Sequence, residues 1–139
     1  ASDWSSDVCS SDLVDDDTVH RMVIARIGSR AGYASETAAT CDDANRMIQP
    51  EAGISCITVD LSLGDRDGRE VLRLIAERNV DAAVIVISGA DEAVRAQTER
   101  FARQLGVRLL EVLPKPVDLK RLRDILVNAR GEADHLAAA

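Results

Sequence analysis

The sequence predicts an α/β fold built on a parallel sheet, and three observations lead to this prediction. Short apolar runs of strand length alternate along the chain with longer segments whose apolar residues recur at helical spacing. The most apolar run, residues 82–88, has no polar alternation, which is typical of a strand buried on both faces, as parallel strands are. Several of the runs end in a polar residue. Strands that alternate with helices favour right-handed βαβ units and therefore one parallel sheet.

Length and composition restrict the possible classes of protein. A chain of 139 residues with 46% hydrophobic residues suits one domain with its own core. No apolar run approaches the roughly 20 residues of a membrane helix. The net charge of −7 argues against nucleic-acid binding, which depends on Lys and Arg. The three cysteines lack metal-ligand spacing, and two histidines are too few for a histidine-based zinc site. We therefore expect a cytoplasmic domain without direct nucleic-acid or membrane contacts.

Residues 1–13 look like a leader and not like part of the native domain. They are polar and low in complexity, and they include the run Ser-Ser-Asp-Val-Cys-Ser-Ser-Asp-Leu. Residues 7–13 also resemble one reading frame of a sequencing adapter, so they are set aside from functional reasoning. We expect this leader to be non-native or disordered, and to overlap a weak first strand at residues 8–14.

The next elements are placed by apolar spacing and by residues that stop helices. Apolar residues at helical spacing predict a helix at residues 18–31, which Gly32 ends. Residues 34–39 form a plausible but polar edge strand. A short helix is expected at residues 42–49, because Pro50 cannot continue it.

The second half of the chain shows stronger signals. The β-branched run at residues 54–60 predicts a central strand. Periodic apolar residues predict a helix at 69–78 and a long, polar helix with a thin apolar stripe at 91–105. A last strand is expected at 107–113 and a last helix at 118–129, where an aspartate stands at the capping position.

Four of the predicted strands end in side chains that can do chemistry. Asp60 ends the central strand, Ser88 ends the most apolar strand, and Lys115 follows the last strand between two prolines. Asp15 and Asp16 follow the weak first strand. Each of these features is unremarkable alone, since an acidic run is usually a solvated turn. The ordered set points to one site, because ligands of open α/β sheets bind at the carboxyl ends of the strands.

This ordered set resembles the receiver domain of two-component response regulators, the CheY-like superfamily, over residues 14–130. The resemblance implies a flavodoxin-like, doubly wound, five-stranded parallel sheet in the order 2-1-3-4-5 with helices on both faces. It leaves residues 131–139 as a tail or the start of a linker. It also implies a phosphorelay function: the domain takes a phosphoryl group from a histidine kinase and switches its output surface. Such a domain catalyses only its own phosphorylation and dephosphorylation.

The resemblance assigns Asp60 as the phosphorylation site and Mg²⁺ as the cofactor. Mg²⁺ is a hard ion that binds carboxylates, phosphate oxygens and water. By the resemblance, Asp16 and Asp60 bind the ion directly and the Ser62 carbonyl is a backbone ligand. Asp15 then acts largely through water.

Ser88 and Lys115 are the catalytic residues that the resemblance implies. The Ser88 hydroxyl would donate a hydrogen bond to one phosphoryl oxygen, and the Lys115 ammonium would contact another. The bond between Lys115 and Pro116 is expected to be cis. Ser88 is also the first half of the family's conformational switch, and Val112 occupies the position of the second half. Most family members have an aromatic residue there, so the sequence predicts a different readout.

The resemblance also implies partners, and two alternatives stay open. The phosphate donor would be a histidine kinase or a phosphotransfer protein. An output domain or a homodimer would use the face formed by the fourth helix, the fifth strand and the fifth helix. One alternative is a haloacid dehalogenase-type phosphatase, because residues 15–19 come close to its Asp-x-Asp motif. The other is a degenerate receiver that acts only as a binding module, since the first strand looks damaged.

Overall fold

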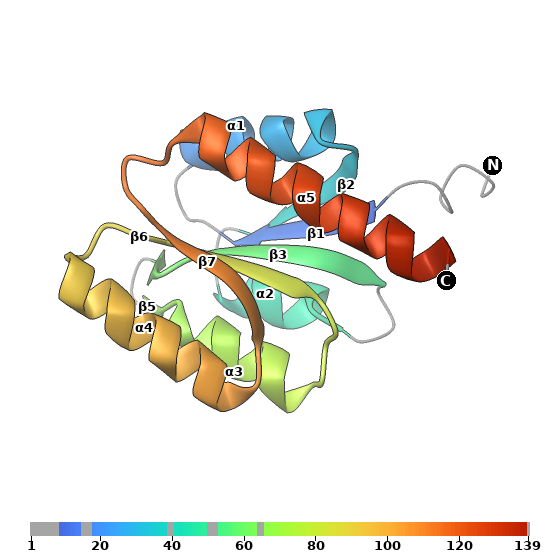
Figure 1. The fold of residues 1–139 in the computed structure, drawn as a ribbon. Helices are drawn as coiled ribbons and strands as arrows, with labels where there is room; N and C mark the ends of the chain where they lie inside the picture. Colours follow the sequence, from blue (N-terminus) through green and yellow to red (C-terminus); the bar gives the residue numbers. More distant parts are fainter. Residues whose placement is uncertain (1–8, 15–17, 39–40, 50–52, 64–65, 139) are drawn as a thin grey trace.

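A five-stranded parallel sheet forms the centre of the protein, in the order β2-β1-β3-β6-β7 (Figure 1). The computed structural model describes residues 9–14, 18–38, 41–49, 53–63 and 66–138. The strands of the sheet are β1 (Cys9–Val14), β2 (Tyr33–Ala38), β3 (Ile54–Asp60), β6 (Ala83–Ser88) and β7 (Arg108–Pro114). A short antiparallel pair, β4 (Ser62–Leu63) and β5 (Arg66–Asp67), follows β3 in a stretch for which the sequence predicted no strand.

Helices cover both faces of this sheet (Figure 1). One face carries α1 (Thr18–Arg30) and α5 (Leu119–Ala138). The other face carries α2 (Cys41–Met47), α3 (Arg69–Glu77) and α4 (Glu92–Leu105). The predicted class, an α/β fold with a parallel sheet and flanking helices, is therefore confirmed.

Two apolar cores result, one on each side of the sheet, and β6 contributes to both. Successive side chains of a strand point to opposite faces. Val84 and Val86 accordingly pack into the core beneath α2, α3 and α4, whereas Ile85 and Ile87 pack into the core beneath α1 and α5. All six residues of β6 are buried, as the unbroken apolar run predicted.

The strand β1 lies inside the sheet although its sequence is polar. It pairs in parallel with β2 on one side and with β3 on the other. Main-chain hydrogen bonds to two neighbours do not depend on side-chain polarity, so a polar segment can occupy this position. The expected range of 8–14 for a first strand agrees with the observed Cys9–Val14.

The last helix is longer than the sequence predicted. We expected it to end at residue 129, but α5 continues through Gly131 to Ala138. A glycine inside a helix costs only about 1 kcal/mol relative to alanine, and the surrounding residues form helices well. In the part of the chain that the structure describes, no helix has the length and apolar character needed to cross a membrane.

Candidate functional site

Three predicted site residues meet where β3, β6 and β7 end. Asp60 is the last residue of β3, and it pairs with Ile87 of the neighbouring β6. Ser88 is the last residue of β6, and it pairs with Pro114 of β7. Lys115 follows directly, and its backbone N–H donates a hydrogen bond of 3.0 Å to the carbonyl of Ser88. The parallel register of three adjacent strands therefore places these residues at one edge of the sheet.

The carboxylate of Asp60 is buried, with 1% of the residue exposed, and it is paired with Lys115. The Lys115 Nζ atom donates a hydrogen bond of 2.6 Å to Asp60 Oδ2. A buried charge is costly unless an opposite charge and hydrogen bonds compensate it, and this ammonium does both. One third of the lysine side chain is exposed, so solvent reaches the lysine but not the carboxylate.

Solvent reaches Lys115 through a hollow of about 430 Å³ at the start of the β7–α5 connection. Val19, His20 and Val117 also line this hollow. The peptide bond between Lys115 and Pro116 is cis. The hollow therefore borders the lysine that is paired with Asp60.

Ser88 is 2% exposed, and its hydroxyl is held by the loop that follows β6. Its Oγ atom accepts a hydrogen bond of 3.1 Å from the backbone N–H of Ala90. A hydroxyl can accept and donate at the same time, so the O–H of Ser88 can still act as a donor. Gly89 leaves room beside the site: a Cβ atom there would meet Lys115 Cδ at 3.7 Å, an ordinary contact.

The main chain of Asp60 and Leu61 packs against Gly68, the residue directly before α3. The Gly68 N–H donates a hydrogen bond of 2.9 Å to the carbonyl of Leu61. A Cβ atom at Gly68 would lie 2.5 Å from the Asp60 carbonyl oxygen and 2.7 Å from Leu61 Cα. Only glycine fits this approach without a shift of the backbone, and the approach fixes the main chain at the end of β3.

The other predicted site residues are only partly described. Asp15 and Asp16 lie outside the described residues, although β1 ends at Val14, which pairs with Val59 one residue before Asp60. Ser62 belongs to β4, and its side chain lies outside what the structure describes.

Val112, the predicted switch position, lies in β7 opposite Val86. It is half-buried and packs against the core beneath α3 and α4. Val112 therefore lies in apolar surroundings, beside the strand β6, which ends at Ser88.

Arg95, which no sequence pattern indicates, connects the loop after β6 to α4. Arg95 Nη1 donates a hydrogen bond of 2.6 Å to the carbonyl of Ala90. Asp91 begins the helix between them, because its carboxylate accepts from the Val94 N–H at 2.9 Å. The capping aspartate was a usable sequence signal for the helix start. Nothing in the sequence pattern distinguishes this arginine from Arg100 and Arg103 on the same helix.

A second polar connection, between Glu111 and Arg121, joins β7 to α5. The Arg121 guanidinium donates two hydrogen bonds to the Glu111 carboxylate, at 3.0 Å and 2.6 Å. The hydrogen bond and the negative charge of Glu111 raise the pKa of Arg121 above its usual value. This pair lies on the face of α4, β7 and α5, which the resemblance predicts to be the output surface.

Comparison with known proteins identifies the family. Residues 13–127 match the response regulator receiver domain. The photosynthetic apparatus regulatory protein RegA of Rhodobacter capsulatus is 31% identical over 121 residues, which cover 87% of this chain and 62% of RegA. The chain thus spans less than two thirds of the length of that relative.

Two solved response regulators show the same fold. One, from Colwellia psychrerythraea, has a TM-score of 0.78 and 25% identity, covering 90% of this chain and 98% of its own. Another, from Burkholderia pseudomallei, was solved with a phosphorylated aspartic acid, a calcium ion and citrate. Its TM-score is 0.67 at 25% identity, covering 94% of this chain and 74% of its own. With a family match over most of its length and with this fold, the chain belongs to the response regulator receiver domain family.

Proposed function

We propose that this domain accepts a phosphoryl group on Asp60 and thereby switches its surface. The observation that carries the proposal is the buried Asp60 carboxylate at the end of β3, with the Lys115 ammonium 2.6 Å away. Receiver domains are signalling domains and not classical enzymes. The match of residues 13–127 to the receiver domain supports this function over that of a haloacid dehalogenase-type phosphatase.

The proposed reaction is an in-line transfer to the carboxylate. An Asp60 oxygen attacks phosphorus, the bond between phosphorus and the donor's nitrogen or oxygen breaks, and an aspartyl phosphate results. Positive charge near the moving oxygens lowers the barrier. Lys115 supplies such a charge, and the Ser88 O–H can donate a hydrogen bond to a phosphoryl oxygen.

A magnesium ion fits the chemistry of the proposed donors. Carboxylate and carbonyl oxygens are the ligands that Mg²⁺ prefers, and Asp60 offers a carboxylate at the edge of the sheet. We propose that Asp15, Asp16 and Asp60 hold the ion together with the Ser62 carbonyl. When bound, it would offset the negative charge of the incoming phosphoryl group. Among the described residues, no group of three metal-ligating side chains occurs, and Asp15 and Asp16 are not among these residues.

Labelling with a small phosphodonor tests the acceptor. The protein is incubated with acetyl phosphate and Mg²⁺, and the acyl phosphate is mapped by mass spectrometry. We expect label on Asp60 in the wild-type protein and none in Asp60→Asn. Asp81→Asn is the matched control, because Asp81 is an exposed acid whose removal changes the charge equally. Full labelling of Asp60→Asn would show that another residue is the acceptor. No labelling of the wild-type protein would instead favour a degenerate receiver.

We further propose that the readout runs through the loop after β6 and not through Val112. A phosphoryl group would draw the Ser88 hydroxyl towards it, and the Ala90 N–H would lose its acceptor. Ala90 is also tied to Arg95, so this movement is passed to the start of α4. Val112 has a branched side chain with few rotamers and no ring to rotate.

Amide hydrogen exchange tests this readout. With a beryllofluoride mimic of the phosphate, we expect the largest change between residues 89 and 100. We expect the change to extend less far along α4 in Arg95→Met, because the connection to the Ala90 carbonyl is lost. Arg100→Met is the matched control, since Arg100 is an exposed arginine of the same helix. A response concentrated in residues 19–27, with residues 89–100 unchanged, would refute the proposed route.

The proposed partners follow from the family. Histidine kinases and output domains are the partners of receiver domains, and we propose a histidine kinase or phosphotransfer protein as the donor here. An output domain or a second copy would bind the face of α4, β7 and α5. The Glu111–Arg121 pair lies on that face, so its disruption by a partner would be visible there. We propose residues 14–130 as the folded domain that carries these contacts.

A further inference from the structure

The helix α5 is attached to the sheet at two points that lie far apart. It follows β7, the strand at one edge, and the Arg121 guanidinium in its first turn binds the Glu111 carboxylate of that strand. Further along, the helix contacts Tyr33, the first residue of β2, which is the strand at the other edge (Figure 1). The helix therefore crosses the whole width of the sheet and is bound near both edges.

Tyr33 holds the middle of α5 through its hydroxyl group. Tyr33 is 4% exposed, and its O–H donates a hydrogen bond of 2.8 Å to the main-chain carbonyl of Leu126. A helix carbonyl can accept this second bond, because its other lone pair serves the N–H four residues further along. The tyrosine therefore binds the main chain of the helix itself, whatever side chain stands at that position.

Gly32, the neighbour of Tyr33, makes a second contact one helical turn further along α5. Gly32 has φ +96°, and the space left by its missing side chain is filled by the Arg130 guanidinium, whose Nη1 and Cζ atoms a Cβ atom would overlap. The Nε atom of Arg130 is buried. Residues 126 and 130 lie on the same face of a helix. We call the contacts of Gly32 and Tyr33 with Leu126 and Arg130 the α5 clamp.

The helix α4, the other helix of the proposed output face, is attached in a different way. Its buried residues are Thr98 and Ala102, whereas residues 92–97 are exposed or half-buried. The bond from Arg95 to the Ala90 carbonyl joins its start to the preceding loop and not to the sheet. Few buried contacts imply a low free-energy cost of local opening. The start of α4 is therefore free to move at a low cost, and the middle of α5 is not.

We propose that the α5 clamp keeps α5 stationary when the domain switches, so that the output face changes by movement of α4 against a fixed α5. This inference rests on the proposed switching function and adds to it the element that does not move. A helix bound near both edges of the sheet cannot shift as a rigid body unless one attachment breaks. The clamp includes Arg130, which lies beyond residue 127, where the family match ends.

A purely structural role for the clamp predicts a different result. Loss of a clamp contact would then lower the stability of the domain, and the residues that respond to a phosphate mimic would stay the same. A clamp that keeps α5 stationary predicts that its loss changes which residues respond.

Amide hydrogen exchange without any phosphate mimic tests the clamp itself. Tyr33→Phe removes the hydroxyl, and Arg130→Met removes the guanidinium but keeps an apolar stem. We expect exchange of the amides of residues 127–134 to rise about fivefold in each variant, because each loses one contact that holds this part of α5. Unchanged exchange in both variants would overturn the proposal, whether or not Asp60 accepts a phosphoryl group.

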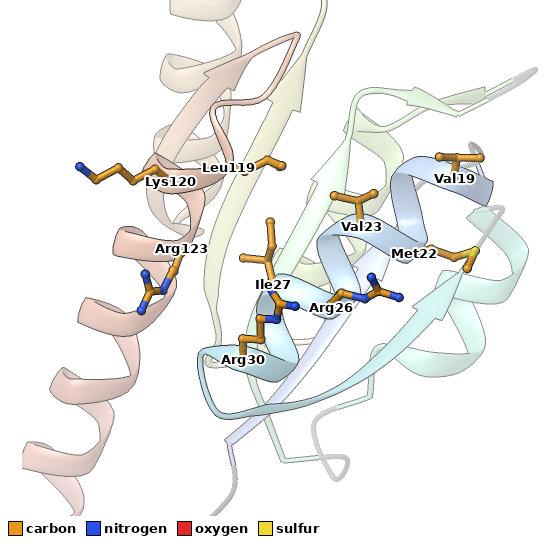
Figure 2. Close-up of a pocket in the computed structure, with 9 residues that line it drawn as sticks. All are labelled: Val19, Met22, Val23, Arg26, Ile27, Arg30, Leu119, Lys120 and Arg123. Atoms are coloured by element: carbon orange, nitrogen blue, oxygen red, sulfur yellow. The ribbon is translucent and has the colours of Figure 1, made fainter.

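Two matched controls accompany these variants. Arg78→Met also loses hydrogen bonds to main-chain carbonyls, but these lie in and after α2. Arg123→Met removes an exposed arginine of α5 that lines the groove between α1 and α5 and does not belong to the clamp (Figure 2). In both controls, exchange of residues 127–134 should stay within about twofold of wild type. A fivefold rise in the controls as well would contradict a specific role of the clamp.

The beryllofluoride mimic then tests whether the clamp keeps α5 stationary. In the wild-type protein, we expect exchange to change in residues 89–100 and to stay within about twofold in residues 119–130. In Tyr33→Phe and Arg130→Met, the change should extend to residues 119–130 and reach at least about threefold, whereas Arg78→Met should respond like wild type.

The outcomes of this second test separate the clamp from the proposed phosphorylation. An equal response of residues 89–100 and 119–130 in the wild-type protein would refute a stationary α5. So would clamp variants in which the same residues respond as in wild type. A wild-type protein in which the mimic changes no residue would overturn both the proposed switch and the stationary role, and the clamp contacts would still be judged by the exchange measured without the mimic.

Discussion

Replacing Gly68 with alanine should disturb the site without touching any side chain that does chemistry. Gly68 adopts φ −58°, which alanine also favours, so the substitution introduces no backbone strain of its own. The new Cβ atom would lie 2.5 Å from the Asp60 carbonyl oxygen, where an unstrained carbon–oxygen contact measures about 3.3 Å. The two main-chain segments must therefore separate by roughly 0.8 Å.

The magnitude of the effect follows from that separation. Overpacking of this kind costs about 1–3 kcal/mol, and the lower entropy of the unfolded alanine chain returns about 0.4–1 kcal/mol. The net loss in the free energy of unfolding should therefore lie between about 0 and 2.6 kcal/mol, with about 1.3 kcal/mol at the middle of the two ranges. Misplacement by about 1 Å can cost on the order of 100-fold in rate, so phosphorylation of Asp60 should slow by about ten- to 100-fold.

Gly89→Ala is the matched control for this prediction. It places a Cβ atom at 3.7 Å from Lys115 Cδ on the opposite side of the same site, which needs no adjustment. Its unfolding free energy should stay within about 0.5 kcal/mol of wild type. Urea unfolding measures the stability, and the rate of labelling by acetyl phosphate measures the reaction. Wild-type stability together with a wild-type rate in Gly68→Ala would refute the argument that this close approach fixes the end of β3.

Three further substitutions probe the polar contacts. Lys115→Met should lower the free energy of unfolding, measured in chelator, by about 1–3 kcal/mol. This is less than for a fully buried ion pair, because the lysine is one third exposed. The same substitution should lower the free energy of unfolding by less in an Asp60→Asn background, where the buried charge is absent. Glu111 raises the pKa of Arg121 in the folded protein above its value in the unfolded chain. Any stabilisation by this pair is therefore fully present below the pKa that arginine has in the unfolded chain. It is lost only when the pH rises through the higher pKa of the folded protein. The urea midpoints of wild type and Arg121→Gln should therefore differ equally at pH 6 and pH 9, and a difference that grows between them would contradict this. Arg78→Met should lower the free energy of unfolding by about 1 kcal/mol. Arg78 donates hydrogen bonds to two main-chain carbonyls, at 2.6 Å within α2 and at 2.7 Å just after it. An unchanged melting temperature would exclude a stabilising role for these two hydrogen bonds.

The strands and helices with clear apolar patterns could be predicted from the sequence. The runs that became β3 and β6 are rich in β-branched residues, and both strands lie within one residue of the predicted bounds. The end of α5 could not be predicted from local signals. Gly131 looks like a stop, but one glycine inside a helix costs only about 1 kcal/mol relative to alanine, and α5 continues through it to Ala138.

The candidate site was predicted in its residue types but not in its contacts. The order of Asp60, Ser88 and Lys115 along the chain, together with the rule that strand ends meet, predicted that they lie together. The ion pair between Asp60 and Lys115 requires the lysine side chain to extend from the end of β7 past β6 to the end of β3. No spacing in the sequence indicates that the side chain takes this direction. Likewise, the bond from Arg95 to the Ala90 carbonyl depends on the path of a loop, which periodicity does not describe.

Because β6 is completely buried, an alternation of polar and apolar side chains cannot determine its register against the neighbouring strands. In a strand with one wet face, a shift by one residue exposes apolar groups and is penalised at once. Here both faces are apolar, so a shift of β6 against β3 and β7 would exchange its valines and isoleucines between two dry cores. The strand's one polar side chain, Ser88, stands at its end, and a shift would place Ile87 or Gly89 beside Lys115 instead. The hydroxyl that the proposed chemistry needs therefore also helps to determine the register of the most buried strand. Replacement of Ser88 by an apolar residue would remove this contribution to the register.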